Sequence, residues 1–153
     1  MIISGLLRKE FIIEELKSTN KHELLEELSR SIQKVYVKFD LEAVIKVLTE
    51  REKLGSTGIG DNIAIPHGKL SGLDDLILAF GRSNSGIDFD TADGKPVNLF
   101  FLLLAPEQNT DQYLKALAKI SRMLKDKYFR KGLMEADTKE QIFQIIEEKD
   151  CQT

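Results

Sequence analysis

The strongest restriction on the fold comes from an uninterrupted apolar run, Leu99-Phe-Phe-Leu-Leu-Leu104. A strand with one face in water alternates apolar and polar residues, whereas a strand covered on both faces does not. The run is also far too short to cross a bilayer as a helix. It therefore predicts a central strand in a sheet that carries helices on both faces.

The rest of the chain supplies the elements that such a sheet needs. Two helices are expected after the capping residues Asn20 and Asp40, and Thr138 with Gln141 is a capping-box signal for a third. Helical periodicity adds segments at 111–125 and 127–135, and strand-like segments lie at 11–13, 63–66, 76–80, 86–89 and 97–104. This order predicts an α/β fold, namely a three-layer α/β/α sandwich with a mixed β-sheet.

Length and composition limit the class of protein. A chain of 153 residues suits a single domain, 1–153, and 42% hydrophobic with 31% charged residues is ordinary for a soluble globular protein. The net charge of -3 gives no reason to expect nucleic acid or an anionic membrane as a partner. A single cysteine, Cys151, and an N-terminus unlike a signal peptide lead us to expect a cytoplasmic protein without direct membrane insertion.

The segment 51–69 gathers the groups that could bind an anion. Gly55, Gly58 and Gly60 allow the backbone to turn its N–H groups toward a ligand, and Ser56 and Thr57 add two hydroxyls. The spacing Gly-x-x-Gly-x-Gly matches neither a Walker A loop nor a dinucleotide fingerprint. A simple glycine-rich turn between a helix and a strand is the alternative reading.

Two side chains in this segment have the chemistry of phosphoryl transfer. Arg51 continues the apolar stripe of the second helix, and its guanidinium could hold a phosphate with two hydrogen bonds. His67 follows the predicted strand 63–66, between Pro66, which fixes φ, and Gly68, which leaves space. The alternatives are a cation that opposes the helix dipole and a histidine satisfied at a strand end.

A resemblance to a known family rests on these residues. Arg51-Glu-Lys-Leu-Gly-Ser-Thr-Gly-Ile-Gly60 and Ile63-Ala-Ile-Pro-His-Gly-Lys69 resemble the active-site signature of the bacterial phosphotransferase system enzyme IIA domains, in the fructose/mannitol and nitrogen-regulatory class. The likeness extends through Gly86-Ile-Asp-Phe89 and Asp93-Gly-Lys-Pro-Val97 to the helix after Pro106, so it covers essentially the whole chain. The resembled family has the three-layer fold expected above.

The resemblance implies a function for these groups. His67 would be the phosphoacceptor, taking phosphate through Nε2 from the phosphohistidine of HPr or an HPr-like protein. Arg51, Ser56, Thr57 and Gly58 would surround the transferred group, because a loose phosphoryl transition state is served mainly by positioning and by donors. This scheme requires no cofactor, neither a nucleotide nor a metal.

One position departs from the family pattern. Many members carry a second histidine where this chain has Tyr113. Tyrosine can donate one hydrogen bond to a phosphoryl oxygen, but it cannot become cationic near neutral pH. Tyr113 is therefore either a partner of His67 or an aromatic packed at a helix start.

Three functions follow from these observations. The first is a regulatory enzyme IIA of the nitrogen-related branch, which binds regulated proteins according to its phosphorylation state. The second is a sugar-specific enzyme IIA that passes phosphate from His67 to an enzyme IIB. The third is a binding module that keeps the fold without phosphate. The absence of a fused IIB or membrane segment and the presence of Tyr113 favour regulation.

Overall fold

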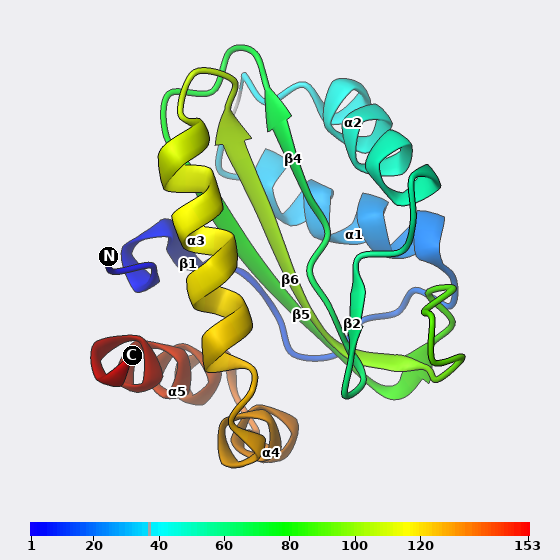
Figure 1. The fold of residues 1–153 in the computed structure, drawn as a ribbon, viewed down its shortest axis with the longest axis vertical. Helices are drawn as coiled ribbons and strands as arrows, with labels where there is room; N and C mark the ends of the chain where they lie inside the picture. Colours follow the sequence, from blue (N-terminus) through cyan, green and yellow to red (C-terminus); the bar gives the residue numbers. More distant parts are fainter. Residues whose placement is uncertain (37) are drawn as a thin grey trace.

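A mixed β-sheet forms the centre of the molecule (Figure 1). The computed structural model describes residues 1–36 and 38–153. Within them the strand order is β1-β5-β6-β3-β2, with β4 also paired to β6. The strands are β1 (Leu7–Ile13), β2 (Gly58–Gly60), β3 (Ile63–Ala64), β4 (His67–Leu70), β5 (Ile77–Ile87) and β6 (Val97–Pro106).

Strand β6 is the central strand that the apolar run predicted. Its residues are buried along the whole strand except at Asn98, which is half-buried. It pairs antiparallel with β5, with Phe80 opposite Phe101, and parallel with β3 and β4, with His67 opposite Leu103. The prediction of a mixed sheet is therefore confirmed.

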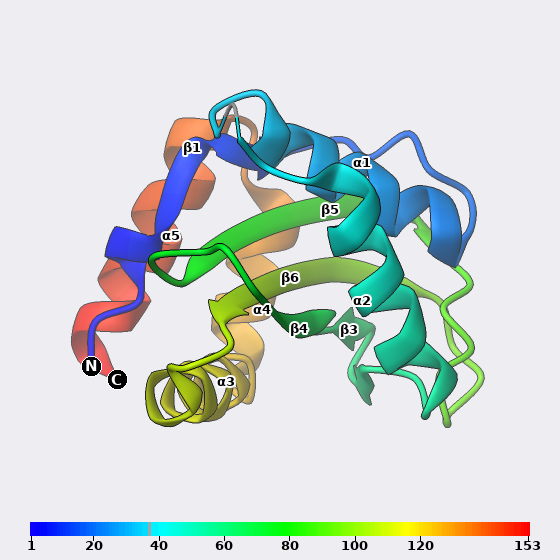
Figure 2. The same cartoon turned by 90° about the horizontal axis from the view of Figure 1, so that it is seen from above.

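Helices cover both faces of this sheet, as Figure 2 shows. On one face lie α1 (Lys21–Gln33) and α2 (Leu41–Lys53), and on the other lie α3 (Thr110–Met123), α4 (Lys127–Glu135) and α5 (Lys139–Gln152). The predicted caps are present: Asn20 and Asp40 accept backbone N–H groups, and Thr138 with Gln141 forms a capping box. The three-layer α/β/α architecture is confirmed, and no helix within 1–36 and 38–153 is long and apolar enough to cross a membrane.

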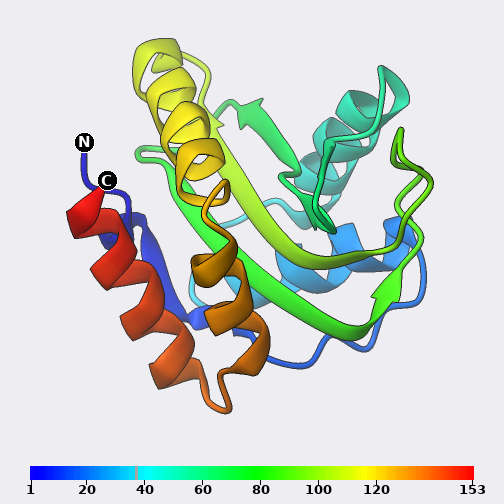
Figure 3. The ribbon, with the colours of Figure 1, turned by 60° about the horizontal axis from the view of Figure 1, so that its bottom comes forward.

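The last helix, α5, packs beside β1, so the two ends of the chain lie close together (Figure 3). Asp150, buried near the end of α5, accepts the backbone N–H groups of Ile3 and Ser4 through Oδ2 at 2.8 and 2.7 Å. Its Oδ1 lies 2.6 Å from Nζ of Lys119 in α3. The start of the chain is thus held against α5, which is in turn paired with α3.

Three strand predictions differ from the structure. The segment 63–66 is not one strand that ends before His67, because β3 stops at Ala64 and His67 is the first residue of β4. Pro66 between them has no N–H for the ladder. The strand expected at 86–89 is the far end of β5, which continues through a bulge. Gly58–Gly60, expected as loop, pairs with β3.

Gly68 brings α2 close to β4 and so sets the position of Arg51. A Cβ at Gly68 would lie only 2.5 Å from Cγ1 of Val47. Val47 is a β-branched residue on α2, one turn before Arg51, so its side chain cannot easily turn away. The glycine therefore lets the last turns of α2 lie directly against the start of β4.

We expect Gly68→Ala to destabilise the protein by about 1–3 kcal/mol, because the added methyl overpacks this contact. Val47→Ala removes the atom that would be struck, so the double variant Val47→Ala/Gly68→Ala should recover most of the loss. Urea unfolding of the wild type, both single variants and the double variant measures the coupling. Additive effects of the two substitutions would contradict this packing.

Candidate functional site

Arg51 and His67 meet between the end of α2 and the start of β4. Nε of Arg51 donates to Nε2 of His67 at 3.3 Å, and Nη1 donates to the carbonyl of Gly55 at 2.9 Å. Both side chains are half-buried. A guanidinium that faces the imidazole nitrogen places a permanent cation where an anion bound to that nitrogen would lie.

The other ring nitrogen of His67 fixes the tautomer. Nδ1 lies 2.6 Å from the carbonyl oxygen of Ile65. A carbonyl can only accept, so Nδ1 carries the proton in this pair. Nε2 is then the nitrogen with the lone pair, which agrees with its role as acceptor from Arg51.

The environment keeps His67 neutral. Burial lowers the pKa of His67 below its ordinary value, and the charge of Arg51 lowers it further. The hydrogen bond to Ile65 and the carboxylate of Glu52 act in the opposite direction without reversing the shift. A neutral imidazole with its lone pair on Nε2 is the form that can act as a nucleophile.

The hydroxyls of Ser56 and Thr57 are bonded within the protein. Ser56 Oγ donates to the carbonyl of Phe89 at 2.8 Å and accepts the N–H of Gly58 at 3.1 Å. Thr57 is buried, and its hydroxyl and N–H both donate to the carboxylate of Glu52. Ser56, Thr57 and Gly58 thus shape the loop between α2 and β2, and as phosphate ligands they stay a prediction.

Tyr113 packs against the histidine from α3. The two ring centroids are 5.9 Å apart with an interplanar angle of 56°. Burial raises the pKa of Tyr113 to about 12, although the charge of Arg51 acts to lower it. The phenol therefore keeps its proton at any physiological pH. The structure brings His67, Arg51 and Tyr113 together from β4, α2 and α3.

Glu52 was not among the site residues predicted from the sequence. The buried positions of α2 are Val44, Leu48 and Glu52, each four residues apart, so the stripe ends on the glutamate, and Arg51 lies at its edge. The four-residue spacing from Leu48 indicates Glu52 as the next buried position. Arg51 was predicted in its place because a guanidinium is suited to binding phosphate. Glu52 also pairs with Lys21 of α1, with 3.1 Å between Oε1 and Nζ.

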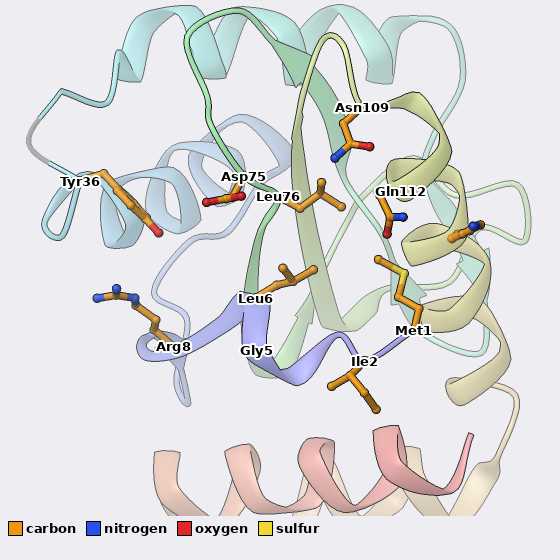
Figure 4. Close-up of a pocket in the computed structure, with 11 residues that line it drawn as sticks. Met1, Ile2, Gly5, Leu6, Arg8, Tyr36, Asp75, Leu76, Asn109 and Gln112 are labelled. Atoms are coloured by element: carbon orange, nitrogen blue, oxygen red, sulfur yellow. The ribbon is translucent and has the colours of Figure 1, made fainter.

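A separate hollow lies away from these residues (Figure 4). It has a volume of about 850 Å³ and lies between the start of the chain, Tyr36, Asp75 and the first turn of α3 around Gln112. None of its lining residues is Arg51, His67 or Tyr113.

Some apolar residues near Arg51, His67 and Tyr113 are in the core and others are on the surface. Ile63 and Ile65 are buried, as expected for core, whereas Ile59 is half exposed. Leu54, immediately after α2, is 84% exposed, and Leu114, next to Tyr113, is 56% exposed. Leu54 and Leu114 each stand next in sequence to a structured element or residue of the site, and their side chains are mostly in solvent.

Comparisons with known proteins identify the family of this chain. Residues 5–149 match the family described as phosphoenolpyruvate-dependent sugar phosphotransferase system, EIIA 2. A nitrogen regulatory protein of Bradyrhizobium diazoefficiens is 40% identical over 146 residues, which are 95% of this chain and 95% of that protein. The fructose-specific EIIABC component of Bacillus subtilis is 35% identical over 150 residues, 98% of this chain but 24% of that protein.

A solved structure shows the same fold. The nitrogen regulatory protein IIA-Ntr of Neisseria meningitidis superposes with a TM-score of 0.88 at 35% sequence identity, over 94% of this chain and 98% of that one. The family match spans almost the whole chain, and the relatives are similar over the same length. This chain therefore belongs to the EIIA 2 family of the phosphoenolpyruvate-dependent sugar phosphotransferase system.

Proposed function

We propose that this protein is a phosphocarrier that accepts a phosphoryl group on Nε2 of His67. The observation that carries the proposal is the pair of contacts on the imidazole, with the Ile65 carbonyl on Nδ1 and the Arg51 guanidinium on Nε2. The first contact directs the lone pair to Nε2, and the second supplies a cation at the same atom. A histidine that only stabilised the fold would not need both.

The donor that suits this site is a phosphohistidine of HPr or an HPr-like carrier. The lone pair of His67 Nε2 attacks phosphorus while the phosphorus–nitrogen bond of the carrier breaks and its electron pair stays on the carrier's imidazole. The positive charge that His67 gains is shared with Nδ1–H, which already donates to Ile65. Atoms and charge balance without any further reactant.

Arg51 is the principal stabiliser of the transferred group in this scheme. Its guanidinium turns from Nε2 of His67 toward the equatorial oxygens as phosphorus approaches, and it keeps its bond to the Gly55 carbonyl through Nη1. Tyr113 lies against the imidazole and remains protonated, so it can donate one hydrogen bond to a phosphoryl oxygen. Ser56, Thr57 and Gly58 maintain the loop and become direct donors only if their internal bonds open.

The destination of the phosphate distinguishes two branches. The 40% identical relative over nearly the full chain is a nitrogen regulatory protein, which favours regulation of partner proteins by phosphorylation state. The alternative is sugar uptake through an enzyme IIB, which is favoured by the fructose-specific relative whose name joins A, B and C components. The exposed Leu54, Ile59 and Leu114 suit a protein partner in either branch.

His67→Ala should abolish phosphorylation. We expect an acid-labile mass gain of one phosphoryl group when the wild type is incubated with phosphoenolpyruvate, enzyme I and HPr or its nitrogen-branch equivalent, and no gain in the variant. The chain offers a matched control in His22, its other histidine, which is exposed on α1. His22→Gln should be phosphorylated like the wild type. A gain that persists in His67→Ala would place the phosphate elsewhere.

The pH dependence follows from the lowered pKa of His67. The neutral form should persist below the ordinary histidine range, and the transfer rate should fall only as the pH drops through the lowered pKa. Arg51→Gln removes a charge that lowers this pKa, so the pKa should rise and the transfer rate fall by roughly 10²–10³. NMR titration of the imidazole and rapid-quench kinetics measure both. Arg30→Gln, on the exposed side of α1, should change neither.

Tyr113→Phe distinguishes a donor from a packed ring. We expect transfer to slow about fivefold, because one neutral hydrogen bond of roughly 1 kcal/mol is lost near the phosphoryl group. The His67 pKa and the thermal midpoint should stay close to those of the wild type, because the ring remains. An unchanged transfer rate would assign Tyr113 to packing alone.

A further inference from the structure

A buried carboxylate, that of Glu52, lies directly behind the Gly55–Gly58 loop, and the proposed transfer makes no use of it. Glu52 is 7% exposed, and an ionised carboxylate rarely enters the interior without partners that justify the burial. It comes one residue after Arg51 on α2, so the two side chains leave the same turn of the helix in different directions.

Glu52 fixes the middle of the loop. Its Oε1 accepts the backbone N–H of Thr57 at 3.1 Å, and its Oε2 accepts the Thr57 hydroxyl. Arg51, the preceding residue, holds the carbonyl of Gly55 through Nη1 at 2.9 Å. One turn of α2 therefore binds the loop at two points, two residues apart, while Arg51 also contacts His67.

Lys21 completes the arrangement from α1. Its ammonium lies 3.1 Å from Oε1 of Glu52, 3.8 Å from Oδ2 of Asp90, and 4.6 Å from the centre of the Phe89 ring. The carbonyl of Phe89 in turn accepts the Ser56 hydroxyl. Lys21 thus neutralises Glu52 and contacts the segment that braces the other side of the loop.

We propose that Glu52, neutralised by Lys21, is a positioning residue that holds the Gly55–Gly58 loop in register with Arg51 and His67. The inference rests on the proposed phosphoryl transfer and assigns Glu52 no contact with the phosphoryl group. Without Lys21, the negative charge of Glu52 would lie uncompensated behind the loop and would repel an incoming phosphate. With it, the loop is anchored by strong hydrogen bonds to a charged group at little electrostatic cost to the site.

The test uses Glu52→Gln in the full-length protein. The amide keeps an oxygen for one Thr57 donor but loses the second acceptor and the charge. We expect the maximal phosphoryl-transfer rate to fall about tenfold at saturating HPr, with little change in the carrier concentration that gives half the rate. Exchange of the Thr57 amide hydrogen should become faster, and the His67 pKa should fall further, because the Glu52 charge raises it. Glu50→Gln, an exposed carboxylate on the same helix, is the matched control.

Two further variants separate positioning from simple stability. Thr57→Val removes the hydroxyl but keeps both the N–H bond and the Glu52 charge, so the His67 pKa should stay unchanged while the rate falls. Lys21→Met should slow transfer, and combining it with Glu52→Gln should cost less than the product of the single effects, because both charges are then absent.

Several outcomes would overturn the inference. A wild-type rate in Glu52→Gln would do so, as would a rate loss matched by the loss of folded protein in thermal unfolding, with the exchange of the Thr57 amide unchanged. If the wild type itself takes no phosphate, the proposed function fails instead. The exchange of the Thr57 amide needs no phosphate, so it still decides whether Glu52 holds the loop.

Discussion

The burial of β6 on both faces determines how the rest of the molecule is built. A strand without polar residues on either side must be covered by two helical layers, and it must have hydrogen-bonded neighbours on both edges. One neighbour is β4, whose first residue is His67. The helix that covers β4 is α2, and Gly68 allows it to approach closely. The histidine and the arginine therefore meet because of how the core is covered.

The site relies on few groups, each with a defined direction. The proton on Nδ1, the lone pair on Nε2 and the guanidinium beside it are all set before any partner arrives. Such preorganisation suits phosphoryl transfer, in which the protein mainly positions groups and stabilises charge. Glu52 and Lys21 extend the same logic behind the loop, where opposite charges compensate each other at 3.1 Å.

The sequence predicted the layers, the helix caps and the central strand, because these depend on local periodicity and capping chemistry. It also indicated Arg51 and His67, through the long motif at 51–69, and Tyr113, through a departure from the family pattern. It could not reveal that Ser56 and Thr57 bond to Phe89 and Glu52, because those contacts join segments that only the tertiary structure brings together. The bulge in β5 was missed for a related reason, since pairing with β6 decides where the register shifts. The break between β3 and β4 had a local signal in Pro66, which lacks the N–H that a strand uses.

The hydrogen bond from His67 to the Ile65 carbonyl has a consequence for how the site can vary. The acceptor is a main-chain atom two residues earlier, so every amino acid at position 65 supplies it. Divergence at this position can alter the core without changing which ring nitrogen is free to react. A shift of the backbone at Pro66, in contrast, would move the acceptor itself. The orientation of the His67 ring is therefore insensitive to substitutions at position 65 and sensitive to insertions or deletions between residues 65 and 67.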